Sequence, residues 1–209
     1  MTPLPKDRSS RPVKRGLDLG SLHRFFLRLL PREARRSYES SEKEAPPDTV
    51  SVLAPSRDEI SGILEAHREW VESGTEAGSR AELGGCNLEG ADLSDAFLKR
   101  AVLTGANLRM ANLKKTNFQG AELSGADLGG ADLEGAWMMG ADLKGANLEG
   151  VNLEGAMLRA GKFQGACLKG ARLARANLQG ARLDNADLTG ADLEGANLTR
   201  ATLEGARGI

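Results

Sequence analysis

The sequence predicts an all-β solenoid preceded by one short α-helix and a basic, proline-rich tail. A five-residue period runs unbroken from residue 81 to residue 205, residues 56–73 carry apolar residues at helical spacing, and the prolines lie within the first 55 residues. With 26 glycines and only 4% aromatic residues in a chain of 209, the composition is typical of a repeat protein or of a disordered chain rather than of a conventional domain.

The tail, residues 1–55, is predicted to be mostly a proline-rich linker with one short amphipathic helix near residues 20–30. Apolar residues there fall on one helical stripe, arginines lie off it, and Pro31 marks the expected end. Residues 1–40 hold ten Lys or Arg against four Asp or Glu, a net charge of +6. The stripe and its arginines are the candidate tail anchor: Leu22, Phe25, Phe26, Leu29, Leu30, Arg24 and Arg28.

Three interpretations of this tail helix remain open. It lies on an anionic membrane surface through residues 20–36, it docks in the groove of a protein partner, or it folds back onto the solenoid. The charge of the tail opposes the third interpretation, because the solenoid face that would receive the helix is also basic. An apolar contact could still outweigh that repulsion.

Residues 56–80 are predicted to form a helix and a linker that cap the N-terminal end of the solenoid. Ser56 and Glu59 have the spacing of a capping box, and Gly74 follows as a stop signal. Such a cap is needed because the open end of a solenoid exposes leucines and unpaired backbone. We expect His67 to be a helix-face residue rather than a ligand. The predicted apolar face consists of Ile60, Ile63, Leu64, His67, Trp70 and Val71.

Residues 81–209 are predicted to form the solenoid, with 25 consecutive pentapeptides in residues 81–205. The third position of the unit is Leu in 22 copies and the first is Ala in 21, and every exception is apolar or small, so both positions are expected to face the interior. A period of five matches neither an α-helix nor a flat strand, and it indicates a coil that turns a corner once per unit. Gly at the fifth position of 17 copies suits such a corner.

Tandem units of the form A-(D/N)-L-x-x, such as GADLKGANLEG at residues 140–150, resemble the pentapeptide-repeat family over 125 of the 209 residues. The resemblance implies a right-handed quadrilateral β-helix with four pentapeptides per coil, hence about six coils and a rod roughly 30 Å long at a strand spacing of ~4.8 Å. It also implies end-to-end dimerisation through the C-terminal coil, which would remove an open sheet edge. The family includes DNA-mimicking gyrase inhibitors, but a fold does not determine a function.

One of the four expected faces differs from the rest. This fourth face comprises the units that begin at residues 96, 116, 136, 156, 176 and 196, and its charges are all basic. The other three faces carry five, four and seven acidic residues. The stretch AWMM at residues 136–139 interrupts the repeat here, with Met138 expected in the core. An exposed apolar patch bordered by basic residues is typical of a binding surface, and the candidate partner-binding residues are Phe97, Trp137, Met139, Met157 and Arg159.

Two interpretations of this patch are open: the protein's own N-terminal segment covers it, or an external partner or a second subunit binds it. No pattern typical of catalysis, of a cofactor or of a metal site is present, since His23 and His67 are the only histidines and no catalytic or metal-ligand spacing occurs. Cys86 and Cys167 are expected to lie ~19 Å apart, too far for a disulfide. With no apolar run that spans a membrane and no secretory signal, a reducing cytoplasm is the expected compartment.

These patterns favour a non-enzymatic interaction scaffold or accessory subunit in the cytoplasm or at its membrane surface. The alternatives are a DNA-mimic inhibitor of gyrase and a protein tethered to the membrane surface. Residues 81–209 hold 16 acidic and 14 basic residues, a net charge of -2, which argues against mimicry of DNA. Together with a whole-chain charge of -1, this balance also argues against a nucleic-acid partner.

Overall fold

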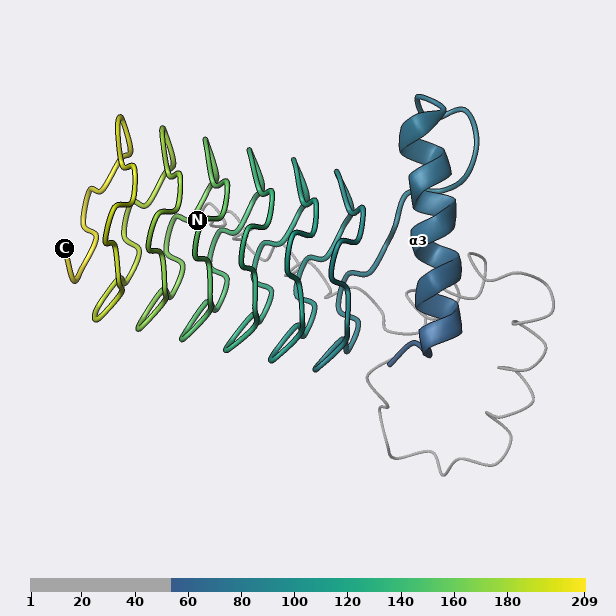
Figure 1. The fold of residues 1–209 in the computed structure, drawn as a ribbon, viewed down its shortest axis with the longest axis horizontal. Helices are drawn as coiled ribbons and strands as arrows, with labels where there is room; N and C mark the ends of the chain where they lie inside the picture. Colours follow the sequence, from purple (N-terminus) through teal and green to yellow (C-terminus); the bar gives the residue numbers. More distant parts are fainter. Residues whose placement is uncertain (1–53) are drawn as a thin grey trace, which may run out of the picture. The chain divides into compact units, whose positions relative to one another are not determined.

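The computed structural model describes residues 54–209. In this part of the chain one α-helix, α3 (Arg57–Glu72), is followed by a solenoid of turns and single-residue bridges from residue 81 onward. Figure 1 shows α3 at one end of the solenoid and the C-terminus at the other. The predicted tail helix and its anchor residues lie outside the described residues. Within residues 54–209 no helix is long and apolar enough to cross a membrane.

Neighbouring coils pair in parallel with a register of twenty residues, so each coil holds four pentapeptides. The second position of each unit bridges to the second position of the unit one coil further on, as Trp137 does with Met157. The Trp137 N–H donates to the Thr116 carbonyl of the preceding coil at 3.0 Å, and the Met138 N–H donates to the Met157 carbonyl of the following coil at 2.9 Å. Bonds of these two kinds pair the inner backbone along the solenoid.

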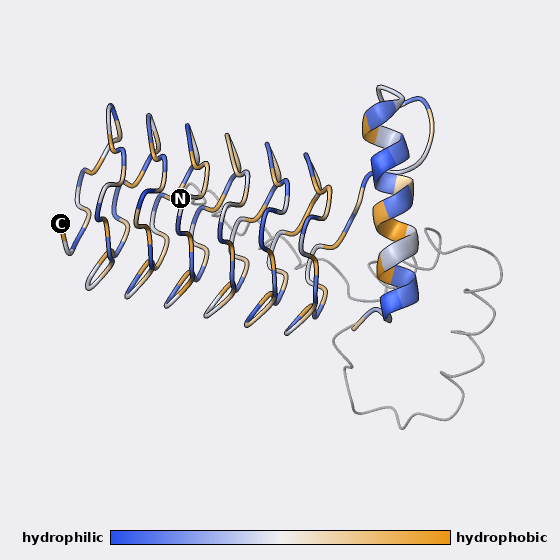
Figure 2. Cartoon of the chain, in the orientation of Figure 1, coloured by the Kyte–Doolittle hydropathy of each residue, from blue (hydrophilic) through white to orange (hydrophobic). Residues whose placement is uncertain are grey.

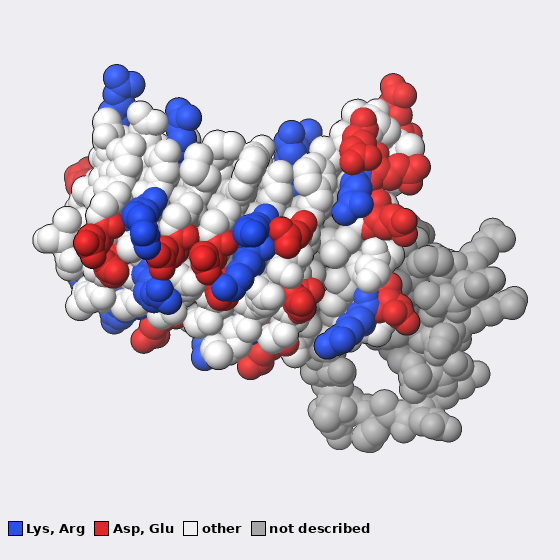
Figure 3. All heavy atoms as spheres, in the orientation of Figure 1, with Lys and Arg blue, Asp and Glu red and all other residues white. Residues whose placement is uncertain are grey.

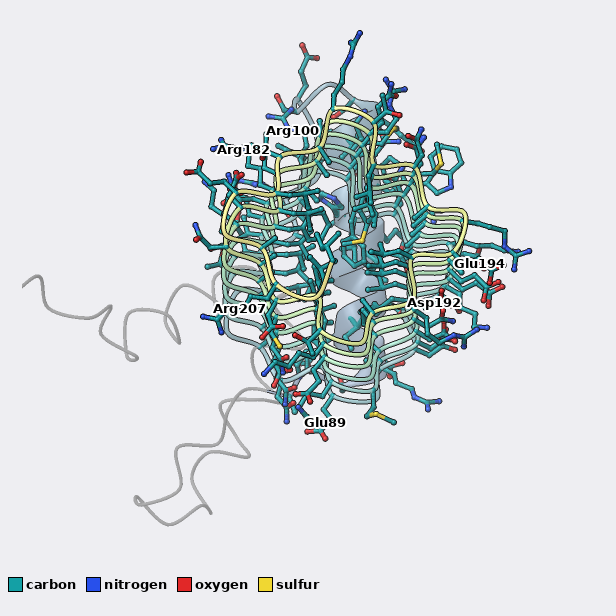
Figure 4. The ribbon with its side chains drawn as sticks, turned by 90° about the vertical axis from the view of Figure 1, so that its left-hand side faces the viewer. Glu89, Arg100, Arg182, Asp192, Glu194 and Arg207 are labelled. Carbon is teal, nitrogen blue, oxygen red and sulfur yellow. The ribbon has the colours of Figure 1, made fainter. Side chains whose placement is uncertain are left out.

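The first and third positions point inward and fill the centre of the coil, as the sequence predicts. The leucines of the third position are at most 2% exposed from Leu83 to Leu188. Hydrophobic and hydrophilic segments alternate around every coil (Figure 2). Viewed along the solenoid, side chains occupy the interior, while Arg182 and Asp192 project from opposite sides (Figure 4). The core is therefore a stack of Leu and Ala layers and not a channel.

The preference for Asp or Asn at the second position has a local cause. Every Asp and Asn at this position accepts a hydrogen bond from the backbone N–H two residues further on. Asp132 Oδ1, for example, accepts from the Glu134 N–H at 3.2 Å and also from Nδ2 of Asn152 one coil away at 2.9 Å. The side chain thus holds the turn that follows and ties neighbouring coils together.

Every corner of the coil uses a left-handed backbone conformation. All 25 fifth-position residues have a positive φ, between 53° and 72°. Glycine adopts this conformation readily, whereas a residue with a Cβ loses about 1 kcal/mol or more there. The eight corners without glycine are Asp95, Arg100, Met110, Lys115, Ala160, Arg175, Asn185 and Arg200.

Gly161 replaces the usual inward alanine because of a neighbouring ring. Phe163 replaces leucine in the same unit and is buried. A Cβ at Gly161 would lie 2.7 Å from Cε2 of Phe163 and 3.0 Å from the Leu158 carbonyl oxygen. The two departures from the repeat are therefore one compensated change, in which the larger ring occupies the space that a methyl group would fill.

We predict that Gly161→Ala lowers the free energy of unfolding by about 1–3 kcal/mol, because the new methyl group overpacks the core against Phe163. Adding Phe163→Leu restores the usual unit and should recover most of that loss. Urea denaturation of the wild type, the two single variants and the double variant gives the free energies of unfolding for this double-mutant cycle. Phe118→Leu, in a different unit, is the matched control and should add to Gly161→Ala without recovery. Strict additivity of Gly161→Ala and Phe163→Leu would contradict this account.

Helix α3 begins at a complete capping box and packs on the first coil. The Ser56 side chain accepts from the Glu59 N–H, and the Glu59 carboxylate accepts from the Ser56 N–H at 2.7 Å. The helix carries both hydrophilic and hydrophobic residues (Figure 2), and its Ile60, Ile63 and Leu64 contact the hydrophobic core of the solenoid. These contacts bury part of the apolar surface at this end of the Leu stack.

His67 is the fully buried residue at the contact between α3 and the first coil. Its Nδ1 accepts the backbone N–H of Ala81 at 3.0 Å, so the neutral ring carries its proton on Nε2, which has no hydrogen-bond partner within residues 54–209. The Trp70 ring stacks on the imidazole, and the Arg100 guanidinium lies 5.5 Å above the Trp70 ring. Burial lowers the pKa of His67, the Lys99 backbone opposes this shift, and the positive charge of Arg80 lowers the pKa further.

We predict that folded-state stability falls as the pH drops below 6.5. The pKa of His67 is lower in the folded protein, so in this range the unfolded chain binds a proton that the folded protein does not. The free energy of unfolding therefore falls by at most about 1.4 kcal/mol for each pH unit, until the pH passes the folded pKa. His67→Gln keeps an acceptor for the Ala81 N–H but does not titrate. The difference in unfolding free energy between the two proteins, measured from pH 8 to pH 5, should show this slope, and a difference independent of pH would refute it.

Candidate partner-binding face

The fourth face places the predicted apolar residues on adjacent coils. Its bridge ladder runs through Phe97, Asn117, Trp137, Met157, Asn177 and Asn197. Trp137 is 51% exposed and Met157 is 36% exposed, while Met139 is half-buried and Arg159 is exposed. These four residues form a two-by-two array on coils ~4.8 Å apart. We refer to Trp137, Met139, Met157 and Arg159 as the Trp137 patch.

The AWMM stretch divides between the core and the surface. Met138 replaces leucine at the inward third position and is fully buried. Trp137 and Met139 lie on either side of it in the chain and point to the other face of the backbone, because side chains alternate along an extended segment. The sequence therefore uses one large residue to fill the core and places its two neighbours at the surface.

Trp137 and Met157 lack the side-chain hydrogen bond to the turn that Asn and Asp make at the same position of the unit. On the coils to either side, Asn117 accepts from the Gln119 N–H at 3.0 Å and Asn177 accepts from the Gln179 N–H at 3.2 Å. Trp137 and Met157 stand at the same position in their units but have no side-chain acceptor. They also leave apolar surface in water, so neither the turn nor the core explains their presence.

The fourth face also carries positive charge. Its basic residues form no ion pair within residues 54–209, whereas nine basic residues in the rest of that range do. Glu154 on the third face, for instance, pairs with both Arg172 and Arg175. Acidic and basic side chains are interspersed over the side of the solenoid seen in Figure 3. The basic residues of the fourth face are Lys99, Arg100, Arg159 and Arg200.

Phe97 does not join the Trp137 patch. It is half-buried, and its ring centroid lies 6.5 Å from that of His67 on α3. Asn117 separates it from Trp137 along the ladder. The five-residue period predicts Phe97 on this face, but no signal in the repeat indicates that α3 contacts its ring.

The other groups that sequence reasoning singled out show no site geometry. Within residues 54–209 no three His, Cys, Asp or Glu side chains are placed to hold a metal ion. Cys86 is buried, and burial raises the pKa of its thiol to about 11. Cys167 is half-buried at an outward position four coils away. His67 binds the backbone of Ala81, as described above, and is a structural residue of α3.

A model of pentapeptide repeats matches residues 81–205 in four overlapping segments, 81–120, 111–138, 136–173 and 166–205, with eight copies of its unit. The chain belongs to the pentapeptide repeat family. Membership implies a right-handed quadrilateral β-helix, which agrees with the four units per coil of residues 81–209. Proteins of this family are generally structural or interaction proteins, and no enzyme family is indicated.

Solved structures of pentapeptide repeat proteins resemble this chain. Rfr23 from the cyanobacterium Cyanothece 51142 is 32% identical over 60% of this chain and 89% of its own, with a TM-score of 0.40. HetL from Nostoc sp. strain PCC 7120, involved in heterocyst differentiation regulation, is 25% identical over 74% and 99%, with a TM-score of 0.33. QnrB1, a plasmid-mediated fluoroquinolone resistance protein, is 20% identical over 58% and 79%, with a TM-score of 0.28. No curated protein matches the sequence.

Proposed function

We propose that this pentapeptide repeat protein is a non-enzymatic interaction protein, a scaffold or accessory subunit that binds a protein partner through the Trp137 patch. The observation that carries the proposal is the pair Trp137 and Met157, which stand exposed at the second position of the unit, where Asn and Asp make a stabilising turn bond. Trp and Arg are enriched among the residues that dominate binding energy, and the patch contains both. Because the solenoid backbone is rigid, binding would order only the side chains of the patch and not its backbone.

The charge of the fourth face indicates the chemistry of the partner. With basic residues but no acidic ones, the face complements a surface that combines apolar side chains with carboxylates. Residues 1–40 of the N-terminal tail, with a net charge of +6 and the candidate anchor Leu22 to Leu30, have the same preference and would supply a second contact to an acidic partner or to an anionic membrane surface. We propose the cytoplasm or its membrane surface as the place where the protein acts.

The alternative of DNA mimicry finds no support in the surface. A mimic of duplex DNA requires a dense and continuous row of negative charge. Here acidic and basic side chains alternate, and many carboxylates are paired with Lys or Arg (Figure 3). The solenoid therefore does not reproduce the field of a nucleic acid, and a gyrase inhibitor of that type is the weaker candidate.

We predict that Trp137→Ala/Met157→Ala weakens capture of the partner from cell lysate by ~30-fold or more, because truncating central hot-spot residues costs about 2 kcal/mol or more. Arg159→Glu should weaken capture through charge. Asn117→Ala/Asn177→Ala, on the coils to either side, is the matched control and should capture the partner normally. Thermal denaturation should show that the Trp137→Ala/Met157→Ala protein remains folded.

Deletion of residues 1–40 separates the two contacts, with soluble and membrane fractions kept apart. Loss of only lipid association would assign the tail to the membrane, and loss of the protein partner would assign it to the same complex as the patch. If the patch variants capture the same proteins as wild type and are only less stable, the Trp137 patch is packing rather than an interface, and the proposal fails.

A homodimer through the C-terminal coil is a second proposal, carried by the open end of the core. Leu193, Leu198 and Leu203 stand at inward positions but are only partly buried, because no described residue covers them. Stacking two such ends would bury these leucines and pair the free backbone edge.

We predict that Leu198→Arg shifts the protein toward monomer, raising the dimer dissociation constant by about tenfold or more, because a charge would enter the apolar contact between two copies. Analytical ultracentrifugation over a range of concentrations measures the shift. Thr199→Arg, an exposed outward neighbour, is the control and should dimerise normally. A wild-type protein that stays monomeric at the highest soluble concentration would rule the dimer out.

A further inference from the structure

Helix α3 and the loop of residues 73–79 that follows it form one unit, which the chain joins to the solenoid at Arg80. The Ser79 N–H donates to the Ala66 carbonyl of α3 at 3.0 Å. A Cβ at Gly78 would collide with the same carbonyl oxygen, so the loop backbone lies directly on the helix. A movement of α3 away from the first coil would therefore carry residues 57–79 together.

Within residues 54–209 a single hydrogen bond joins α3 to the coils. In this bond Nδ1 of His67 accepts the backbone N–H of Ala81 at 3.0 Å. Apolar contacts with the core add to it, through Ile60, Ile63 and Leu64. No ion pair of the described residues joins α3 to a coil. The attachment of the helix thus contains one directional bond between polar groups, and a titratable ring makes it.

A proton on His67 is incompatible with this bond. The neutral ring carries its hydrogen on Nε2, so a second proton can bind only at Nδ1, the atom that accepts the Ala81 N–H. Both ring nitrogens of an imidazolium are donors, so the Nδ1–H and the Ala81 N–H would face each other with no acceptor between them. Protonation therefore removes the bond, and it leaves a positive charge on a ring that is fully buried.

The positive groups around the ring come from both the linker and the first coil. Burial lowers the pKa of His67, the Lys99 backbone opposes this shift, and the charge of Arg80 lowers the pKa further. Arg100 of the first coil lies over the Trp70 ring of α3, which stacks on the imidazole. These neighbours disfavour an imidazolium between α3 and the coil, so a proton binds more readily when the two separate.

The carboxylates nearest this contact act on Arg80 rather than on the ring. Glu122 pairs with the Arg80 guanidinium at 2.7 Å. Burial raises the pKa of Glu82, the charge of Arg80 lowers it, and Glu122 raises it again. Glu82 loses its negative charge as the pH falls, so it does not compensate a positive charge on His67 at acid pH. Within residues 54–209 neither carboxylate forms a hydrogen bond or an ion pair with the imidazole.

We propose that His67 is a proton-operated latch: protonation at Nδ1 breaks the bond to Ala81 and releases α3 with its loop from the first coil, while the coils stay folded. The coils retain the backbone hydrogen bonds from one coil to the next, in which α3 takes no part. Release would uncover the end of the leucine stack and the backbone edge of the first coil, and such surfaces favour association. This inference does not depend on the Trp137 patch, and it can fail while the proposed function stands.

The direction of the effect follows from the lowered pKa. A released His67 has an ordinary pKa near 6.5, and the docked residue binds the proton less tightly. Docking is therefore complete in strength above that pH and weakens as the pH falls below it. Each pH unit lowers the equilibrium constant for docking by up to about tenfold, until the pH passes the docked pKa.

Amide hydrogen exchange of the full-length protein, followed by NMR at pH 8 and at pH 5, tests the proposal. Exchange is expressed as a protection factor, which removes the intrinsic dependence of amide exchange on pH. Protection of the Ala81 amide should fall by about tenfold or more at pH 5, because docking alone protects it. The Asn107 amide, bonded to the Cys86 carbonyl between two coils, is the internal reference and should keep its protection.

Two spectroscopic signals separate release of the helix from loss of one bond. In His23→Gln the only histidine is His67, and its ring nitrogens should titrate over the same pH range in which Ala81 loses protection. In Trp137→Phe the only tryptophan is Trp70, and its fluorescence should shift to the red over that range, because the ring leaves the contact with the coil and enters water.

Two variants identify the group that titrates. His67→Gln keeps an acceptor for the Ala81 N–H but binds no proton, so its protection at Ala81 should be the same at both pH values. Glu82→Gln removes the neighbouring carboxylate and should respond to pH as the wild type does. If His67→Gln does not fold, the pH midpoints of ring titration and of Ala81 protection in the His23→Gln protein still decide, since the latch requires them to coincide.

Four results would overturn the proposal. Unchanged protection of Ala81 at pH 5 would show that no release occurs. Equal loss at Ala81 and Asn107 would show unfolding of the whole solenoid. An undiminished response in His67→Gln, or its disappearance in Glu82→Gln, would assign the response to another group. Loss of Ala81 protection without a change in Trp70 fluorescence would show that the bond breaks while α3 stays docked.

Discussion

The twenty-residue register of the backbone ladder is the constraint on which the rest of the molecule depends. Each coil turns four corners, and the residue at each corner has a left-handed backbone conformation. After four corners the chain returns to the same place in the coil, so each residue lies beside the residues twenty before and twenty after it. A slip of one position would expose the leucines and bury the carboxylates, and the packed interior therefore holds the register. Because of this register, changes at positions 137 and 157 become one surface patch.

Departures from the repeat fall into two groups with different physical consequences. Inward departures are compensated: Gly161 makes room for Phe163, and the Thr116 hydroxyl donates to the Leu93 carbonyl at 2.7 Å. Outward departures at Trp137 and Met157 are not compensated, since they lose a turn bond and expose apolar surface. Stability alone accounts for the first group. Stability does not account for the second group, and this contrast is what the proposed interaction role rests on.

The two ends of the solenoid differ in how far the core is covered. At the N-terminal end α3 covers part of the leucine stack and contributes His67, whose ring accepts the Ala81 N–H. Arg80 ties the linker to the coils, because its Nε donates to the Arg100 carbonyl at 2.6 Å and its guanidinium pairs with Glu122. At the other end the last leucines are only partly buried. Among the described residues, the core is therefore covered in part at the N-terminal end and less at the C-terminal end.

The period of five, read from the sequence, was enough to predict which positions face inward, where corners occur and which face lacks acidic residues, because each coil repeats the same local geometry. The capping box at Ser56 could also be predicted from the sequence, since it depends only on two residues three positions apart. The contact of Phe97 with His67 and the incomplete burial of Ala91 could not be predicted from the sequence. They arise where a helix without the period meets a coil that has it, and such contacts depend on how the two elements pack in three dimensions.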